Sequence, residues 1–367
     1  MGIKQTPFLQ ATDLMPEVLD WQLGDPRLAL ARAVQELSAG KLVVLPTEAG
    51  YHLVASMLHL PALAGLAQVA DPAESMLLVR SLQDALRFAP GMSDAARRLA
   101  RRCWPGPLTL VVQSAGDPQV AGQEVVRMRM PAHEAILSTL DRQSEPLIAV
   151  PVGAGASTVD EMIATLGEAA SLVIKEGPPA AALTISVVEV RGDTWSVTRP
   201  GSITAAMLED LMKTTIMFVC TGNTCRSPLA EALCKKLLAE RLGCTPADLP
   251  ARGFQVISAG LAAMIGADAS PEAVAVAHSF GADLSGHRSQ PLTAELLTRA
   301  DHLFAMTTSH LRTLQLFLPP EGPQPRLLAA DGSDVPDPIG REPEVYRECA
   351  QLILRQLENC LQEVRPL

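Results

Sequence analysis

The chain has 367 residues, of which 48% are hydrophobic and 19% are charged, and its formal net charge at pH 7 is −10. This length favours two domains, and the composition excludes both an extensively disordered chain and a strongly basic nucleic-acid-binding protein. The longest apolar runs have the length of a strand and are too short to span a membrane.

The seven cysteines are an odd number, and the first ten residues lack a basic segment followed by an apolar core. Neither a framework of disulfides nor a secretory leader is therefore expected. We expect a cytoplasmic protein whose thiols are reduced.

Strands are expected in the first half of the chain at residues 41–46, 108–112, 125–130, 146–152 and 184–190. Helical segments separate them, for example at residues 25–40, where Asp25 is a typical N-cap and Gly40 a typical helix end. This irregular mixture predicts an α/β or α+β domain over residues 1–213, built on a twisted mixed sheet.

A regular alternation begins at Thr215. Strands are expected at residues 215–219, 254–260 and 301–307, and helices at residues 227–243, 270–281, 293–300 and 342–364. Such an alternation builds a parallel sheet with helices on both faces, and ligands bind at the carboxyl ends of its strands. We therefore expect a second α/β domain over residues 214–367.

The first of these strands leads into the stretch MFVCTGNTCRSPLAEAL at residues 217–233. Its two cysteines, Cys220 and Cys225, do not fit a closed zinc site, which needs four ligands, because no second pair lies at a matching spacing. Their spacing also differs from the C-x-x-C of thioredoxin-like redox motifs. We expect neither a metal nor another cofactor here.

A nucleophile with an anion-binding loop explains more of these residues. Cys220 ends a buried strand, and Gly222 and Asn223 tolerate backbone angles that turn successive N–H groups inward. Ser227 is a typical N-cap, so a helix should begin after the loop with its positive end facing the same space. Arg226 offers a fork for two phosphate oxygens. Buried, inert cysteines in a turn would leave Arg226 and Asn223 unexplained.

The segment VCTGNTCRSP at residues 219–228 resembles the signature loop of the low-molecular-weight protein phosphatases. Three similar segments come later in family order, namely VISAG at 256–260, SGHRSQPLTAELLTRADHLFAM at 285–306 and DVPDPIG at 334–340. The resemblance runs from about Ile216 to the C-terminus. It implies a phosphatase that works through a cysteinyl-phosphate intermediate.

The same resemblance implies the roles of the matching residues. Cys220 would attack phosphorus, Arg226 would bind the phosphate, and Asp337 would be the general acid, with Asp334 as its rival. The remaining residues of the phosphate-binding loop are Thr221, Gly222, Asn223, Thr224, Cys225 and Ser227.

Two residues outside the loop would support it. By the resemblance, Ser258 hydrogen bonds to the loop and His287 bonds Asn223, although an ordinary core or surface histidine is the alternative for His287. Cys225 is either a resolving thiol for Cys220 or a buried bystander.

Two positions bear on the substrate, which we expect to be a phosphorylated protein. Thr224 stands where tyrosine-specific members usually have a larger aliphatic residue, and it resembles the protein-arginine phosphatases. Ile339 stands where an aromatic residue usually follows the Asp-Pro pair. Both residues favour phosphoarginine as the substrate, but neither excludes phosphotyrosine. Arsenate reduction is disfavoured, because no cysteine lies between Cys244 and Cys349 to relay a disulfide.

Residues 25–210 resemble the YrdC-like threonylcarbamoyl-adenylate synthases, which make an adenylate from threonine, bicarbonate and ATP for tRNA modification. The segments that carry the resemblance are KLVVLPTEAGYHL at 41–53, CWPGPLTLVV at 103–112, VVRMRMPAH at 125–133 and VTRPGSIT at 197–204.

This sequence departs from the synthase pattern at three places. Val69 and Asp71 replace a Lys-x-Arg pair, Pro151 and Gly153 replace a Ser-x-Asn motif, and His52 replaces a glycine. A carboxylate in place of cations repels a triphosphate. We expect a domain that has lost synthase activity and serves as a binding or regulatory module, and retained synthase activity is the alternative.

A further hypothesis for this domain is weak binding of a nucleotide or of RNA, double-stranded RNA included. Four arginines, Arg97, Arg98, Arg101 and Arg102, lie on adjoining positions of a predicted helix and could contact phosphates. An ordinary solvated helix face is the alternative. The net charge favours that alternative, since residues 1–213 contain 17 basic and 23 acidic residues, a balance of −6.

Overall fold

The computed structural model describes residues 15–69, 71–114, 124–153, 158–177, 183–318 and 322–364. The chain divides into two compact units between Ala205 and Ala206, whereas the sequence pattern predicts a boundary between residues 213 and 214. Helix α7 (Ala205–Met212) accounts for the difference, because its Asp210 accepts a hydrogen bond of 2.7 Å from Arg299 of the second unit.

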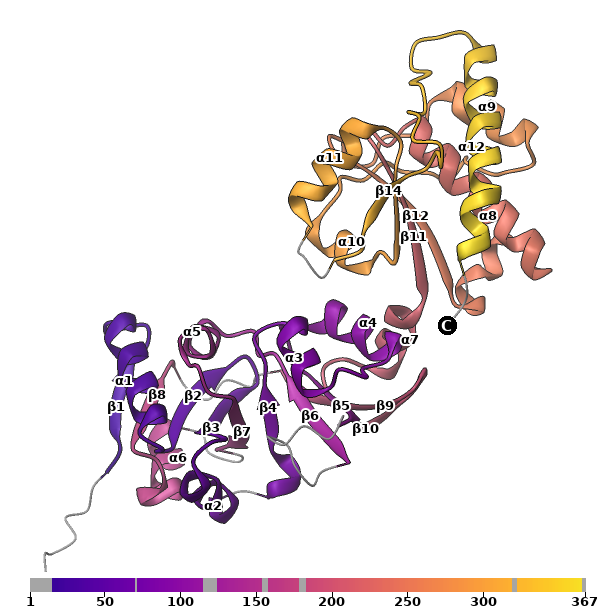
Figure 1. The fold of residues 1–367 in the computed structure, drawn as a ribbon. Helices are drawn as coiled ribbons and strands as arrows, with labels where there is room; N and C mark the ends of the chain where they lie inside the picture. Colours follow the sequence, from indigo (N-terminus) through magenta and orange to yellow (C-terminus); the bar gives the residue numbers. More distant parts are fainter. Residues whose placement is uncertain are drawn as a thin grey trace, which may run out of the picture. The chain divides into compact units, whose positions relative to one another are not determined.

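The N-terminal unit is built on a ten-stranded sheet with the order β1-β8-β2-β3-β7-β4-β6-β5-β9-β10 (Figure 1). Its strands are β1 (Glu17–Asp20), β2 (Val43–Thr47), β3 (Gly50–Ser56), β4 (Met76–Leu78), β5 (Leu108–Gln113), β6 (Val125–Arg129), β7 (Leu147–Val152), β8 (Leu172–Lys175), β9 (Ser186–Arg191) and β10 (Thr194–Arg199). Strand β2 pairs antiparallel with β3 and parallel with β8, which confirms the mixed sheet expected from the sequence.

Helices cover both faces of this sheet. They are α1 (Pro26–Ser38), α2 (Leu60–Val69), α3 (Leu82–Phe88), α4 (Asp94–Cys103), α5 (Glu134–Arg142) and α6 (Val159–Leu166), with short 3₁₀ turns η1 (Pro72–Glu74) and η3 (Gly167–Ala169). Because side chains alternate along a strand, Val43 and Leu45 of β2 pack with α1 and α5, whereas Val44 packs with α2 and α6.

The C-terminal unit has a parallel sheet, as the sequence predicts, and its strand order is β12-β11-β13-β14. Its elements are β11 (Thr214–Cys220), α8 (Arg226–Leu242), η4 (Pro246–Arg252), β12 (Phe254–Gly260), α9 (Pro271–Ser279), α10 (Ala294–Arg299), β13 (His302–Ala305), α11 (Thr308–Phe317), β14 (Pro325–Leu327) and α12 (Pro343–Glu363). In the described part of the chain, no helix combines the length and the apolar character needed to cross a membrane.

Strand β11 is buried on both faces and lies between the two hydrophobic cores of this unit. Ile216, Phe218 and Cys220 belong to a core that contains α8, α9 and α12, whereas Met217 and Val219 belong to a smaller core with α10 and α11 (Figure 1). Because β12 and β13 cover both edges of β11, its backbone groups are paired along its length. Cys220 therefore emerges at the carboxyl end of a fixed strand.

Several elements were missing from the sequence prediction, among them strands β1, β3, β4, β8, β10 and β14 and helix α11. Strand β3 comes after β2 and a two-residue turn, Glu48 and Ala49, and pairs with β2. Helix α11 begins after Thr307, whose side chain accepts a hydrogen bond from the backbone N–H of His310. The signal for α11 was present, because a threonine precedes apolar residues at helical spacing, Leu311 and Leu314.

Candidate active site

The sulfur of Cys220 lies at the centre of a closed loop between β11 and α8. Cys220 is 3% exposed. Its Sγ accepts a hydrogen bond of 3.3 Å from the backbone N–H of Asn223 and lies 3.0 Å from Ser227 Oγ. Helix α8 starts directly after the loop, so its positive end adds to the field at this point. The site therefore favours a bound anion next to the sulfur.

Asn223 fixes the shape of the loop. Its φ is +54°, the left-handed conformation that asparagine tolerates better than most residues, whereas Gly222 has no positive φ, contrary to expectation. The Asn223 side chain is fully buried and donates from Nδ2 to Ser227 Oγ at 3.0 Å and to Ser258 Oγ at 2.8 Å. Its Oδ1 accepts from the N–H of Gln290 at 2.9 Å.

Strand β12 and the segment after α9 hold the loop from outside. His287 Nε2 lies 2.8 Å from the carbonyl oxygen of Asn223, so it contacts the residue expected from the sequence, at its backbone. The Ser258 hydroxyl in turn donates a hydrogen bond to Glu231 Oε2 at 2.6 Å. Gly260 was not singled out in the sequence, yet a Cβ there would lie 2.6 Å from the carbonyl oxygen of Thr221. Its lack of a side chain lets β12 approach the loop.

Ser227 does not cap helix α8, contrary to the sequence prediction. The helix begins at Arg226, with Cys225 at the N-cap and no side-chain capping bond. Ser227 therefore lies in the first turn, where its hydroxyl is free to face Cys220 Sγ instead of a backbone N–H. Ser227 thus contacts the sulfur of Cys220 and does not cap the helix as predicted.

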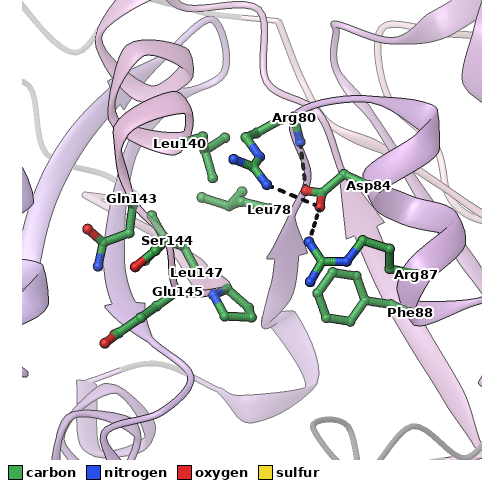
Figure 2. Close-up of a pocket in the computed structure, with 11 residues that line it drawn as sticks. Leu78, Arg80, Asp84, Arg87, Phe88, Leu140, Gln143, Ser144, Glu145 and Leu147 are labelled. Carbon is green, nitrogen blue, oxygen red and sulfur yellow. Dashed lines mark hydrogen bonds and ion pairs between the residues drawn. The ribbon is translucent and has the colours of Figure 1, made fainter.

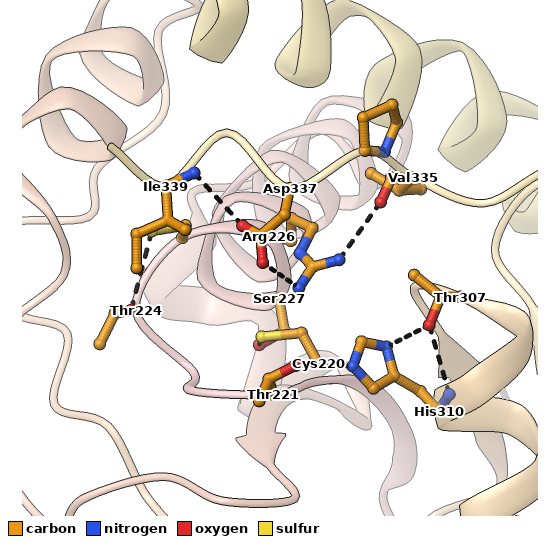
Figure 3. A network of polar contacts seen from close by, with 12 residues as sticks. Cys220, Thr221, Thr224, Arg226, Ser227, Thr307, His310, Val335, Asp337 and Ile339 are labelled. Atoms are coloured by element: carbon orange, nitrogen blue, oxygen red, sulfur yellow. Dashed lines mark hydrogen bonds and ion pairs between the residues drawn. The ribbon is translucent and has the colours of Figure 1, made fainter. Parts of the chain in front are cut away.

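Arg226 and Asp337 meet above the sulfur (Figure 3). Arg226 is 6% exposed, donates to Asp337 Oδ2 at 2.5 Å and also donates to the carbonyl oxygen of Val335 at 3.3 Å. Asp334 instead binds the start of α11. Its Oδ1 accepts hydrogen bonds from the N–H of Thr308 at 2.6 Å and from the Thr308 hydroxyl at 2.9 Å. These bonds lower the pKa of Asp334. Of the two rival carboxylates, only Asp337 contacts Arg226.

The far side of the loop contains Thr224 and Cys225. Figure 3 shows Thr224 and Ile339 on the same flank of the site, and Ile339 is 62% exposed. Cys225 is buried, with its Sγ 3.5 Å from Ser270 Oγ and 3.6 Å from the hydroxyl of Tyr346. Burial raises the pKa of Tyr346 to about 12, so its hydroxyl keeps its proton at neutral pH. Cys225 and Cys220 are both free thiols in this structure.

A histidine that the sequence prediction missed lies on the opposite flank. His310, on α11, is 5% exposed, and its Nε2 lies 2.9 Å from Thr221 Oγ1. Its Nδ1 lies 2.9 Å from Thr307 Oγ1. Burial, followed by the charge of Arg226, lowers the pKa of His310.

The N-terminal unit contains a buried polar cluster at the β2–β3 turn. Arg129 is fully buried and donates to Glu48 Oε1 at 2.6 Å and to the carbonyl oxygen of Gly106 at 3.2 Å. Its Nη1 lies 3.3 Å from Nε2 of His52, whose Nδ1 lies 3.2 Å from Thr47 Oγ1. Burial and the charge of Arg129 lower the pKa of His52 to about 3, so its ring is neutral.

The residues that replace the synthase motifs lie around η1 and β7. Val69 ends α2, and Asp71 caps η1 by accepting from the N–H of Ala73 at 2.9 Å. Pro151 pairs with His52 across β3 and β7, and Gly153 comes directly after β7 with a φ of +79°. Ala70 and residues 154–157, which belong to the same motifs, lie outside the described residues.

The four arginines of α4 do not form one solvated face. Arg98 is 7% exposed, and the side chains of Arg97, Arg101 and Arg102 are half-buried. Arg97 Nε donates to the carbonyl oxygen of Met92 at 2.8 Å. Burial of Arg98 contradicts both the hypothesis of four phosphate-contacting arginines and the favoured alternative of a solvated helix face.

Figure 2 shows a small pocket near α3 and the start of β7. Asp84 occupies one side and pairs with both Arg80 and Arg87, at 3.5 Å and 3.2 Å. The cavity has a volume of about 20 Å³, which is room for roughly one water molecule. This pocket has no room for a nucleotide.

Comparison with known proteins assigns both halves of the chain. The family model described as "Low molecular weight phosphotyrosine protein phosphatase" matches residues 215–366, and the Sua5/YrdC model, described as "Telomere recombination", matches residues 35–201. A provisionally named threonylcarbamoyl-AMP synthase of Mycobacterium leprae is 29% identical over 212 residues, which are 54% of this chain and 94% of that protein.

Two curated phosphatases match the C-terminal half. The probable low molecular weight protein-tyrosine-phosphatase EpsP of Ralstonia nicotianae is 34% identical over 154 residues, 42% of this chain and 97% of that protein. The protein-arginine-phosphatase of Bacillus subtilis is 36% identical over 162 residues, 41% of this chain and 98% of that protein. Through its C-terminal half, fused to a YrdC-like domain, the chain thus belongs to the low-molecular-weight protein phosphatase family of cysteine-dependent hydrolases.

Proposed function

We propose that the C-terminal domain removes phosphate from phosphorylated protein side chains, with Cys220 as the nucleophile. The convergence of Cys220, Arg226 and Asp337 carries this proposal, because the arginine and the carboxylate meet at 2.5 Å over the sulfur that ends β11. A domain that only bound phosphate would need the loop and the arginine. It would have no use for a carboxylate next to them.

The proposed reaction has two steps. In the first, the thiolate of Cys220 forms a bond to phosphorus while the bond to the leaving oxygen or nitrogen breaks, and Asp337 gives its proton to the leaving atom. In the second, the carboxylate of Asp337 takes a proton from water, which attacks phosphorus and breaks the S–P bond. Inorganic phosphate leaves and the thiolate is restored.

Arg226 and the loop provide electrostatic stabilisation in both steps. The Arg226 guanidinium is nearly buried, which strengthens its attraction for the phosphoryl oxygens. In the present structure it pairs with Asp337. A bound phosphoryl group would compete for that guanidinium and release Asp337 to face the leaving atom.

The nucleophile is tested by the Cys220→Ser variant. We expect wild type to release phosphate from phosphopeptides, and the variant to be slower by on the order of a thousandfold or more, because a serine hydroxyl is not ionised at neutral pH. Single-turnover phosphate release measures this. Equal, slow release by both proteins would sink the catalytic proposal.

The general acid is tested by comparing Asp337→Asn with Asp334→Asn. We expect kcat to fall about 100- to 10,000-fold for the first, because an amide cannot exchange the proton. The second should change kcat by less than about fivefold, because Asp334 caps the start of α11. Steady-state rates on phenyl phosphate measure both. A reversed order would make Asp334 the acid.

The substrate proposal is phosphoarginine, and it rests on Thr224 and Ile339. Thr224 provides a hydroxyl beside the site, and Ile339 offers no ring to stack on phosphotyrosine. The curated relatives include phosphatases named for either substrate, so the proposal of phosphoarginine is based on these two residues and not on the relatives.

Thr224→Ile tests the preference. We expect kcat/KM for phosphoarginine peptides to fall about tenfold, with phosphotyrosine peptides unchanged or faster, because the hydroxyl is replaced by an apolar side chain. A wild type that prefers phosphotyrosine would refute the inference.

For the N-terminal domain we propose a binding or regulatory role without synthase activity. The carboxylate of Asp71 replaces a cation of the family motif, and Arg129 is already paired with Glu48. The accessibility of the α4 arginines does not favour RNA binding, since Arg98 is buried.

We infer a cytoplasmic location from the seven free cysteines.

Loss of synthase activity is tested with the full-length chain. Incubation with ATP, threonine and bicarbonate should release no more pyrophosphate than a reaction without threonine. The reason is that the domain lacks the cationic side chains that would bind the triphosphate. Threonine-dependent release would restore the synthase alternative.

A further inference from the structure

His310 is a buried titratable group next to the phosphate-binding loop that the proposed reaction does not use. It lies on α11, and its ring bridges Thr307 at the start of that helix and Thr221, the residue after Cys220 (Figure 3). Thr221 is an exposed residue, so a ligand at the site can approach it. The ring therefore connects α11 with the wall of the candidate site.

The hydrogen bonds around His310 determine where its proton lies. In the described part of the chain, the Thr307 hydroxyl has two partners, both in His310: it accepts from the backbone N–H at 3.3 Å and lies 2.9 Å from Nδ1. Nδ1 is the one acceptor within reach of the hydroxyl proton among the described residues, so we assign that proton to the hydrogen bond with Nδ1. A neutral ring that accepts at Nδ1 carries its proton on Nε2.

Thr221 is the next group in this chain of hydrogen bonds. With the proton on Nε2, the ring donates to Thr221 Oγ1 at 2.9 Å, so the Thr221 hydroxyl is used as an acceptor. Its own proton remains available, and Figure 3 shows Thr221 beside Cys220 on the flank from which His310 approaches.

We propose that His310 is a positioning residue, which holds Thr221 Oγ1 so that the hydroxyl proton is donated to an oxygen of the bound phosphoryl group. This inference rests on the proposed phosphatase function. It adds a side-chain donor to the loop N–H groups and the Arg226 guanidinium.

The surroundings keep the ring neutral. Burial and the charge of Arg226, from α8, lower the pKa of His310, and the carboxylates of Asp334 and Asp337, from the loop before α12, oppose them without reversing the direction. A neutral ring cannot donate from both nitrogens, so the order of donors along Thr307, His310 and Thr221 is preserved near pH 7.

A matched pair of variants separates positioning from packing. In His310→Asn the amide takes the place of Nδ1, keeps Thr307 and does not reach Thr221. In His310→Gln the amide nitrogen reaches the place of Nε2. We expect kcat/KM to fall about tenfold for His310→Asn and about tenfold for Thr221→Val, each the loss of one hydrogen bond. His310→Gln should stay within about threefold of wild type.

The double variant His310→Asn with Thr221→Val provides the decisive comparison. We expect it to be no more than about threefold worse than Thr221→Val alone, because both changes remove the same interaction. The affinity for inorganic phosphate, measured by calorimetry, should show the same pattern. Thermal unfolding verifies the fold, and His278→Asn, an exposed histidine on α9, should leave kcat/KM and phosphate affinity unchanged.

Two results would overturn the inference. One is an equal loss in His310→Asn and His310→Gln, which indicates packing alone; the other is a multiplied loss of about a hundredfold in the double variant, which indicates independent effects. The phosphate affinities keep this test separate from the proposed function. If wild type binds phosphate but does not turn over, the catalytic proposal fails while the pattern of affinities still decides the role of His310.

Discussion

The phosphate-binding loop depends on the buried side chain of Asn223. A left-handed backbone is unfavourable for a residue with a Cβ, yet the Asn223 amide gains hydrogen bonds with Ser227, Ser258 and Gln290, each worth about 1 kcal/mol. These bonds tie the loop to β12, to α8 and to the segment before α10. The donors that surround the sulfur are therefore oriented before any anion arrives, which is the condition for strong electrostatic stabilisation.

Two histidines contact this loop. His287 contacts the carbonyl oxygen of Asn223, and His310 contacts the hydroxyl of Thr221. Residues 335–337 form another side of the site, where Asp337 and the carbonyl oxygen of Val335 both contact Arg226. Every side of the site thus comes from a different part of the chain, while Cys220 ends the most buried strand of the domain.

The N-terminal domain uses its polar residues in the opposite way. Arg129 and Glu48 pair with each other inside the domain, and His52 is neutral and fully buried between Arg129 and Thr47. Partners that satisfy one another leave few free donors for a ligand. In the C-terminal half, Cys220, Arg226 and Asp337 instead converge at the end of one strand, and this convergence is the physical basis for assigning the chemistry to that half.

The sequence by itself indicated the two families through the resemblance of their motifs. Through local spacing it indicated the class of each sheet and the loop from Cys220 to Ser227: strand, small turn, arginine, helix. It did not determine that α8 begins at Arg226 or that the Ser227 hydroxyl faces the Cys220 sulfur, because that contact depends on how the first turn of the helix packs on the end of β11. The choice between Asp334 and Asp337 as the partner of Arg226, the close approach at Gly260 and the bridge made by His310 depended on segments far apart in the chain. Only the tertiary structure decided these, because packing of the parallel sheet brings the strand ends and their loops to one point.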